Sequence, residues 1–201
     1  MTPVTAISSP LGIAVIAVVL IDVVFLYYML LTQREDFKEK SNYVFLAHGS
    51  FFFAAFNINI LGFGKGPLFM LGVMIAIVVL YYFLCSIPLA VTIITILNIT
   101  TLFPIMNTIF LGPFIGDKAG AFLGGFIGLG IAVALAFFFP DFLMKVHNLF
   151  VVYIYTALLV SLLGLTSLVP LTASLESKPN ALNMITSIIL FVVIGVLVFM
   201  K

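Results

Sequence analysis

A single carboxylate in the middle of an apolar segment is the residue best placed to do chemistry. Asp22 lies near the centre of residues 11–32, which contain no other charged side chain. A carboxylate at the midplane of a bilayer costs about 2.5–3.5 kcal/mol on insertion scales, and such groups usually face a bundle interior and mark ion or proton routes. We therefore predict that Asp22 binds a proton or a cation. The alternative is a protonated Asp22 that only holds two helices together.

A second group of polar residues precedes a proline in the apolar segment 88–111. Asn98, Thr100 and Thr101 come shortly before Pro104, which cannot donate a backbone hydrogen bond to the carbonyl of Thr100. A helix is expected to kink or open there, and freed carbonyls beside amide and hydroxyl groups could bind a cation or solute. We predict that Asn98, Thr100 and Thr101 contribute to ion or proton binding. Prolines also occur in membrane helices without any site, so a purely structural role stays open.

The two histidines, His48 and His147, are the remaining candidates for proton or metal chemistry. In a seven-helix topology both lie near the cytoplasmic ends of their helices and could meet. Two axial histidines can ligate a haem, and either one can relay protons. A lone pair without further His, Cys or carboxylate ligands is a poor metal site. The sequence therefore predicts no metal and no cofactor, and a haem- or quinone-binding redox subunit is the weakest interpretation.

Small residues recur at four-residue steps in the apolar segment 117–139. Residues four apart share one face of a helix, so these positions form a continuous groove. Such a groove lets another helix approach closely, within the chain or between copies of it. Helix packing is the main interpretation, and a pore lining is the second. The positions are Gly120, Gly124, Gly128, Ala132 and Ala136.

The composition places these candidates in a membrane. Of the 201 residues, 64% are hydrophobic and 7% are charged, and the mean hydropathy is +1.38. A soluble domain carries about 25% charged residues, which it needs to cover its surface with polar groups. A net charge of +1 also argues against nucleic acid as a partner, because phosphate binding needs clustered Lys and Arg. The sequence predicts an integral membrane protein with the lipid bilayer as its partner.

Apolar segments long enough to cross a hydrocarbon core of about 30 Å predict seven helices. The fold class is then an all-α, polytopic transmembrane helical bundle, a single membrane domain over 1–201 with no soluble domain. A six-span alternative leaves the second segment outside the membrane, because it contains His48, Asn57 and Asn59. Gly112-Pro113 is expected to end the fourth helix. The predicted helices are 11–32, 41–64, 67–84, 88–111, 117–139, 147–169 and 181–200.

The orientation follows from basic residues, which are in excess on short cytoplasmic loops. The connector 34–40 carries Arg34, Lys38 and Lys40. This predicts an N-terminus outside the cell and a multi-pass protein of the cell (inner) membrane.

Together these residues favour a small transport or channel subunit that moves an ion or small solute, with Asp22 as the titrating or ion-binding group. The alternative is a non-catalytic accessory, assembly or immunity subunit of a larger membrane complex that packs through its small-residue face. In either case we expect a homo-oligomer or other membrane subunits as partners. The sequence contains no phosphate-binding loop, H-E-x-x-H motif or G-x-S-x-G motif, which argues against an enzyme.

Overall fold

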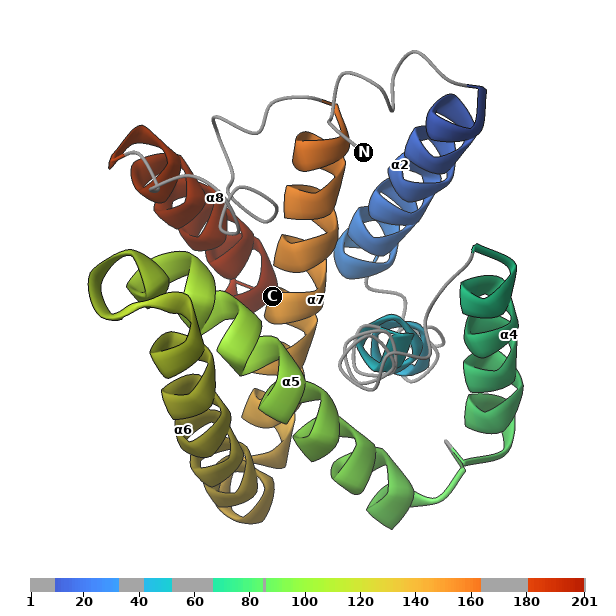
Figure 1. Cartoon of the computed structure of the whole chain (residues 1–201). Coiled ribbons are helices and arrows are strands. Elements are labelled where there is room, and N and C mark those ends of the chain that lie inside the picture. The colour runs from blue at the N-terminus through green and yellow to red at the C-terminus, as the bar shows by residue number, and fades with distance from the viewer. Residues whose placement is uncertain (1–9, 33–41, 52–66, 85, 164–180, 201) are drawn as a thin grey trace. The chain divides into compact units, whose positions relative to one another are not determined.

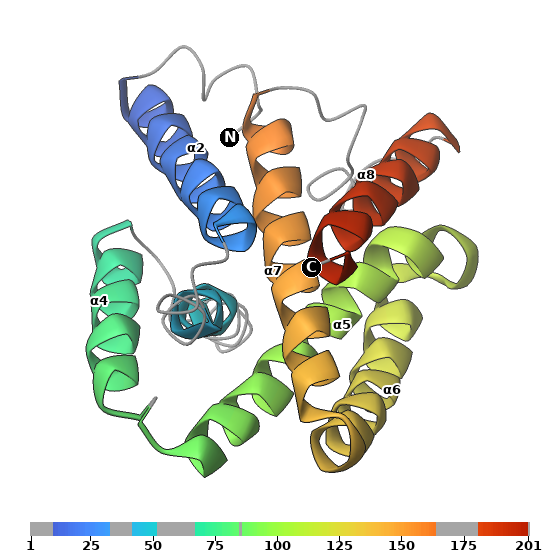
Figure 2. The same cartoon turned by 180° about the vertical axis from the view of Figure 1, so that it is seen from behind.

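The computed structural model describes residues 10–32, 42–51, 67–84, 86–163 and 181–200. Within these ranges the regular secondary structure consists of seven helices and contains no strand, so the prediction of an all-α fold is confirmed. Figures 1 and 2 show the helices from opposite sides. They are α2 (Pro10–Leu31), a helix over 42–51, α4 (Pro67–Leu84), α5 (Pro88–Ile115), α6 (Asp117–Phe138), α7 (Pro140–Leu162) and α8 (Ala181–Phe199).

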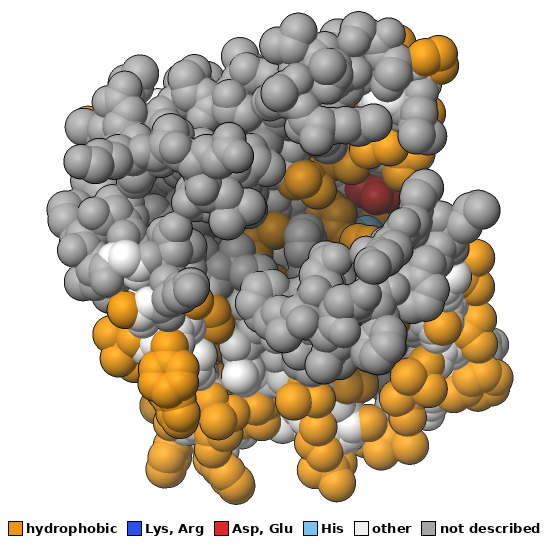
Figure 3. Space-filling view, viewed as in Figure 1, with side chains coloured by type: hydrophobic (Ala, Val, Ile, Leu, Met, Phe, Trp, Pro, Cys, Tyr) orange, Lys and Arg blue, Asp and Glu red, His pale blue; other side chains and the backbone are white. Residues whose placement is uncertain are grey.

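Three of the described helices are long and apolar enough to cross a membrane. These stretches are Gly12–Leu31, Ala119–Phe138 and Pro140–Val160. Twenty helical residues rise about 30 Å, which matches the hydrocarbon thickness of a bilayer. Large hydrophobic side chains lie exposed on the first two of these stretches, and hydrophobic atoms predominate among the coloured atoms of the face in Figure 3. Length, composition and surface together suggest a membrane protein.

Prolines begin four of the helices. Pro10, Pro67, Pro88 and Pro140 are the first residues of α2, α4, α5 and α7. The first helical position suits proline, because the backbone N–H there has no partner within the helix and the fixed φ angle is already helical. These four prolines therefore mark where the helices begin.

The end of α5 differs from the prediction. The helix continues through Gly112 and Pro113 to Ile115, so the expected break at 111 is wrong. The chain turns instead at Gly116, whose φ of 88° is readily adopted only by glycine. The helix thus ends where the backbone becomes left-handed and not at the proline.

The start of α7 also differs. The helix begins at Pro140, so the prediction that it begins at 147 is wrong. Pro140 suits the first helical position, and Asp141 in the first turn interacts favourably with the positive end of the helix dipole. The polar residues of the first two turns hide this part of the helix from an analysis of apolar length. The segment 164–180, the connector 34–40 and most of the predicted helix 41–64 lie outside the described residues.

The helices divide into two compact units made of non-contiguous segments, and α5, α6 and α7 contribute to both. The prediction of a single membrane domain stays a prediction. The first unit comprises Met1–Gln33, Asn107–Ala121 and Val152–Lys201, and the second comprises Arg34–Met106 and Phe122–Val151.

In the first unit, α2 and α8 lie on either side of α7 (Figures 1 and 2). Leu26 of α2, Ile154 of α7 and Ile194 of α8 are completely buried. The rings of Tyr153 and Phe191 meet edge to face with centroids 5.5 Å apart, which joins α7 to α8.

In the second unit, two apolar clusters hold the helices together. Leu46 of the helix 42–51 packs with Tyr81 of α4. Ile99 of α5, Ala132 of α6 and Leu143 of α7 form the other cluster. Buried polar side chains lie among the same helices, and they form the more extensive of the two candidate sites described next.

Candidate functional site

Asp22 lies in the first unit, at the centre of the apolar stretch Gly12–Leu31. At 1.5 Å per residue it is about 15 Å from one end of this stretch and about 14 Å from the other. Its side chain is partly buried, and its charge acts on the phenol of Tyr155 on α7, which is itself buried. The carboxylate singled out from the sequence therefore lies close enough to a phenol on α7 to interact with it electrostatically.

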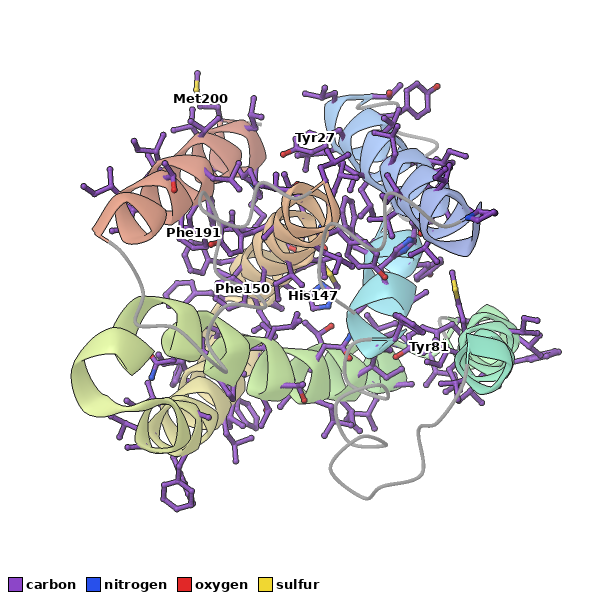
Figure 4. The ribbon with its side chains drawn as sticks, turned by 45° about the horizontal axis from the view of Figure 1, so that its top comes forward. Tyr27, Tyr81, His147, Phe150, Phe191 and Met200 are labelled. Carbon is purple, nitrogen blue, oxygen red and sulfur yellow. The ribbon has the colours of Figure 1, made fainter. Side chains whose placement is uncertain are left out.

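A second polar contact joins the same two helices. The hydroxyl of Tyr27 lies 3.3 Å from Oγ1 of Thr156. Thr156 donates its hydroxyl hydrogen to the carbonyl of Val152 at 2.7 Å, so Tyr27 is the donor to Thr156. Figure 4 shows Tyr27 on α2, the helix that also carries Asp22.

The other predicted ion-binding residues belong to the second unit, so the predicted set is divided between the units. Thr100 donates its hydroxyl to the carbonyl of Ile96 at 2.7 Å, and Thr101 is buried. The predicted opening at Pro104 is not seen: α5 is one continuous helix on both sides of this residue. Membrane helices tolerate such a proline when neighbouring groups satisfy the freed carbonyl.

Asn98 is at the centre of a buried polar network that sequence analysis did not predict. Its Oδ1 accepts a hydrogen bond of 2.9 Å from the hydroxyl of Ser50, which is also hydrogen-bonded to the hydroxyl of Tyr81. Its Nδ2 donates to the carbonyl of Leu46 at 3.2 Å. Ser50, Tyr81 and Asn98 are all buried, so these bonds join α4, the helix 42–51 and α5 away from solvent.

His147 continues this network on α7. Its Nε2 lies 3.1 Å from Nδ2 of Asn98, and its Nδ1 lies 3.2 Å from Oδ1 of Asn148. Asn148 in turn donates to Oδ1 of Asn42 at 3.4 Å, which returns the network to the helix 42–51. In Figure 4, Tyr81 reaches from α4 and His147 from α7 toward that helix.

The backbone of the helix 42–51 closely approaches two of these polar side chains at Gly49. A Cβ atom on Gly49 would lie 2.5 Å from Nε2 of His147 and 2.9 Å from Nδ2 of Asn98. Any side chain larger than hydrogen would therefore collide with both polar groups. Glycine at this position lets the helix 42–51 lie directly against the His147–Asn98 pair.

The two histidines do not form a haem site as they are placed. Nε2 of His147 is engaged with Asn98 and is covered by Gly49, and Nδ1 faces Asn148. An iron atom on either nitrogen would have to displace these groups. His48 uses its Nδ1 to donate to the carbonyl of Val44 at 2.8 Å, within its own helix.

The small-residue stripe of α6 faces the interior of the chain. Leu123 and Ile127, on the other face, are 46% and 43% exposed. A Cβ on Gly128 would lie 2.6 Å from Cβ of Phe103, and one on Gly125, beside the stripe, would lie 3.7 Å from Pro104. From Gly128 onward the stripe thus packs against α5 within the second unit. Of the five positions, Gly120, Gly124, Gly128 and Ala132 are buried and Ala136 is half-buried.

Sequence reasoning missed Ser50, Tyr81, Asn148 and Asn42. They lie on three different helices, and the hydrogen-bonded pairs are separated by 31 to 106 positions along the chain, except for His147 and its neighbour Asn148. No linear spacing connects them. The presence of Asn98 in the middle of an apolar helix was the one available signal, because a buried amide needs partners.

Among the described residues, no group of three or more His, Cys, Asp or Glu side chains is arranged to hold a metal ion. Comparison with protein-family models, curated proteins and solved structures finds no significant match to this chain. The functional argument therefore depends on the two polar sites themselves: Asp22 with Tyr155, and the network around Asn98 and His147.

Proposed function

We propose that the chain is a multi-pass membrane subunit that moves an ion or small solute, with a proton or cation bound and released at Asp22. The observation that supports this proposal is the position of Asp22. Its carboxylate lies midway along an apolar span and interacts with the buried phenol of Tyr155. Carboxylates at this depth commonly mark ion and proton routes.

The chemistry of the neighbouring group fits a carboxyl that changes its protonation state. A phenol hydroxyl can donate a hydrogen bond to a carboxylate and can accept one from a carboxylic acid. Tyr155 can therefore interact favourably with both forms of Asp22. A fixed cationic partner would favour only the ionised form.

The membrane arrangement that belongs to this proposal has seven spans, with six as the alternative, and an N-terminus outside the cell membrane. Besides the three long spans, shorter apolar helices cover Gly72–Tyr81, Pro88–Pro104 and Ile185–Phe199. These would complete a bundle in which the exposed hydrophobic side chains contact lipid.

An accessory subunit that binds partners through the small-residue face is less well supported. That face is used within the chain, since Gly128 of α6 is in contact with Phe103 of α5. A partner would have to bind elsewhere, for example on the exposed face of α6 around Phe122 and Phe126, which is equally suited to lipid.

Flux measurements on a matched pair of variants test the role of Asp22. Wild type, Asp22→Asn and Asp141→Asn are reconstituted in liposomes containing a pH-sensitive dye, and proton flux is followed under imposed pH, Na⁺ and K⁺ gradients. Asn imitates the protonated acid in shape, so Asp22→Asn should fold normally and lose pH-dependent flux. Asp141 is exposed at the start of α7, and Asp141→Asn should behave as wild type. Unchanged pH-dependent flux in Asp22→Asn would contradict the proposal.

Thiol labelling tests the orientation. In a Cys85→Ala background, Phe37→Cys places a single cysteine in the basic connector, and it should resist membrane-impermeant reagents in intact cells. Lys201→Cys should be protected as well if there are seven spans and should be labelled if there are six. Ready labelling at position 37 would reverse the proposed orientation.

A further inference from the structure

The hydrogen-bonded network around Asn98 runs in one direction, which follows from counting donors. Ser50 has one hydroxyl hydrogen and donates it to Oδ1 of Asn98. The hydroxyl of Tyr81 must therefore be the donor in its bond to Ser50. The first two bonds thus point from α4 to the helix 42–51 and from there to α5.

The same counting fixes the proton on His147. The two hydrogens of Nδ2 on Asn98 go to the carbonyl of Leu46 and to Nε2 of His147, so Nε2 accepts and carries no proton. The single proton of the neutral ring is then on Nδ1, from which it is donated to Oδ1 of Asn148. The opposite orientation of the Asn98 amide would place its oxygen against the oxygen of Leu46, which excludes it.

We propose that six hydrogen-bonded residues form a directional lock across four helices: Tyr81, Ser50, Asn98, His147, Asn148 and Asn42. The joint of this lock is the imidazole of His147, which is neutral and protonated on Nδ1. A proton added to Nε2 opens this joint. The lock lies in the second unit and is independent of the proposed role of Asp22.

The reason for the opening is geometric. A proton on Nε2 would face the N–H of Asn98, so two donors would oppose each other at 3.1 Å. Asn98 could present its oxygen only by rotating its amide, which would break its bond to Leu46. Because a Cβ on Gly49 would lie 2.5 Å from Nε2 of His147 and 2.9 Å from Nδ2 of Asn98, neither group can shift toward the helix 42–51 without displacing it.

Few titratable groups surround the joint. The portions of α5 and α6 in this unit, 88–106 and 122–138, contain none in their sequences. The hydrogen bonds to Asn98 and Asn148 determine which ring nitrogen of His147 carries the proton. The titratable residues in the described helices of the other elements of the unit are Tyr43 and His48 on the helix 42–51, Tyr81 and Tyr82 on α4, and Asp141 and Lys145 on α7.

Nitrogen-15 NMR of histidine-labelled protein tests the tautomer directly. The chain has only two histidines, so a His48→Gln variant assigns the signals of His147. At neutral pH we expect one protonated nitrogen, identified as Nδ1, and one unprotonated Nε2. A neutral ring protonated on Nε2, or an imidazolium at neutral pH, would overturn the lock.

An Asn98→Asp variant tests the opening. A carboxylate at position 98 can only accept, so it should bring a proton to Nε2 and release the carbonyl of Leu46. We expect the imidazolium signal at neutral pH and amide exchange in residues 46–50 that is faster by about fivefold or more, as befits a lost hydrogen bond. Asn107→Asp makes the same change on α5 outside the lock, and His147 should be unaffected by it.

Exchange that stays at the wild-type rate while Nε2 is protonated would refute the opening. If Asn98→Asp does not fold, both signals are followed in wild type during acidification. Protonation of Nε2 should then coincide with faster exchange at 46–50, and exchange that increases before protonation would equally refute it.

Discussion

Gly125 and Gly128 of α6 face Pro104 and Phe103 of α5, and the approach is closer at Gly128. Adding one methyl group at Gly128 should therefore separate the two helices. In Gly128→Ala the new Cβ would lie 2.6 Å from Cβ and 2.9 Å from Cγ of Phe103. Carbon atoms in contact are about 3.5–4.0 Å apart, so the helices must move apart by about 1 Å. Cβ of Phe103 is attached to its backbone and cannot rotate away.

The expected loss of stability combines two opposing effects. Overpacking of this kind costs about 1–3 kcal/mol. The separation would also loosen the contacts of Ile99, Ala132 and Leu143, which form the core cluster beside the collision. Alanine in place of glycine recovers up to about 1 kcal/mol through its higher helix propensity. A control with the same propensity gain and no collision is therefore needed.

Gly130 supplies that control on the same helix. A Cβ on Gly130 has no neighbour within 4 Å, so Gly130→Ala changes propensity alone. Gly125→Ala should behave similarly, since its Cβ would be 3.7 Å from Pro104, an ordinary contact distance. The free energy of unfolding should be lower in Gly128→Ala than in Gly130→Ala by about 1–3 kcal/mol.

The assay is reversible unfolding in mixed micelles of a mild detergent and dodecyl sulfate, followed by far-ultraviolet circular dichroism. The chain contains no tryptophan, so helicity is a better signal than fluorescence. Gly128→Ala should unfold at a clearly lower fraction of dodecyl sulfate than the other two variants. Equal midpoints for Gly128→Ala and Gly130→Ala would show that α6 does not pack on α5 through this face.

Two further predictions use the same titration. Gly49→Ala should be less stable than Gly72→Ala by about 1–3 kcal/mol, because its Cβ would lie 2.5 Å from Nε2 of His147 whereas nothing lies within 4 Å of a Cβ on Gly72; equal stabilities would contradict the close approach. Tyr27→Phe and Thr156→Val should each cost about 0.5–1.5 kcal/mol, and the double variant should cost little more than either one. Strictly additive losses would show that the two hydroxyls do not interact.

The helix boundaries that sequence could predict are those that apolar length and proline define together. The helices α2, α4, α6 and α8 begin and end within one residue of the predicted limits. A run of about 20 apolar residues must be a helix in a membrane, because only internal hydrogen bonds can satisfy its backbone. Length therefore predicts such helices well, whatever their neighbours are.

The first two turns of α7 could not be predicted in this way. Asp141, Lys145 and His147 interrupt the apolar pattern there, although each has a local reason to be in a helix. The carboxylate of Asp141 interacts favourably with the positive end of the helix dipole. The ring nitrogens of His147 are hydrogen-bonded within the buried network. A polar residue in a helix is explained by its partners in space, and these are invisible in the sequence.

The candidate sites differ in the same way, because one of them depends on local sequence and the other depends on how the helices pack. The four-residue spacing of the α6 stripe identifies one face of one helix, so the sequence contains all the information needed to predict it. The network around Asn98 needs four helices at once, with Ser50 separated from Asn98 by 48 positions and His147 by 49. The sequence predicted Asn98 only as part of an ion- or proton-binding group beside Pro104, because its actual partners depend on how the helices pack.

This packing also bears on which titratable group is better suited to carry a proton. An imidazole titrates nearest to neutral pH, so by residue type alone His147 is a better proton carrier than a carboxyl group. In the structure both nitrogens of His147 are hydrogen-bonded to amides, and one added proton sets two donors against each other. Asp22 instead interacts with a hydroxyl, a group that can donate to the charged form and accept from the neutral one. Reversible protonation requires a neighbour that suits both states, and this requirement supports the proposal that the exchangeable proton or cation is bound at Asp22 rather than at His147.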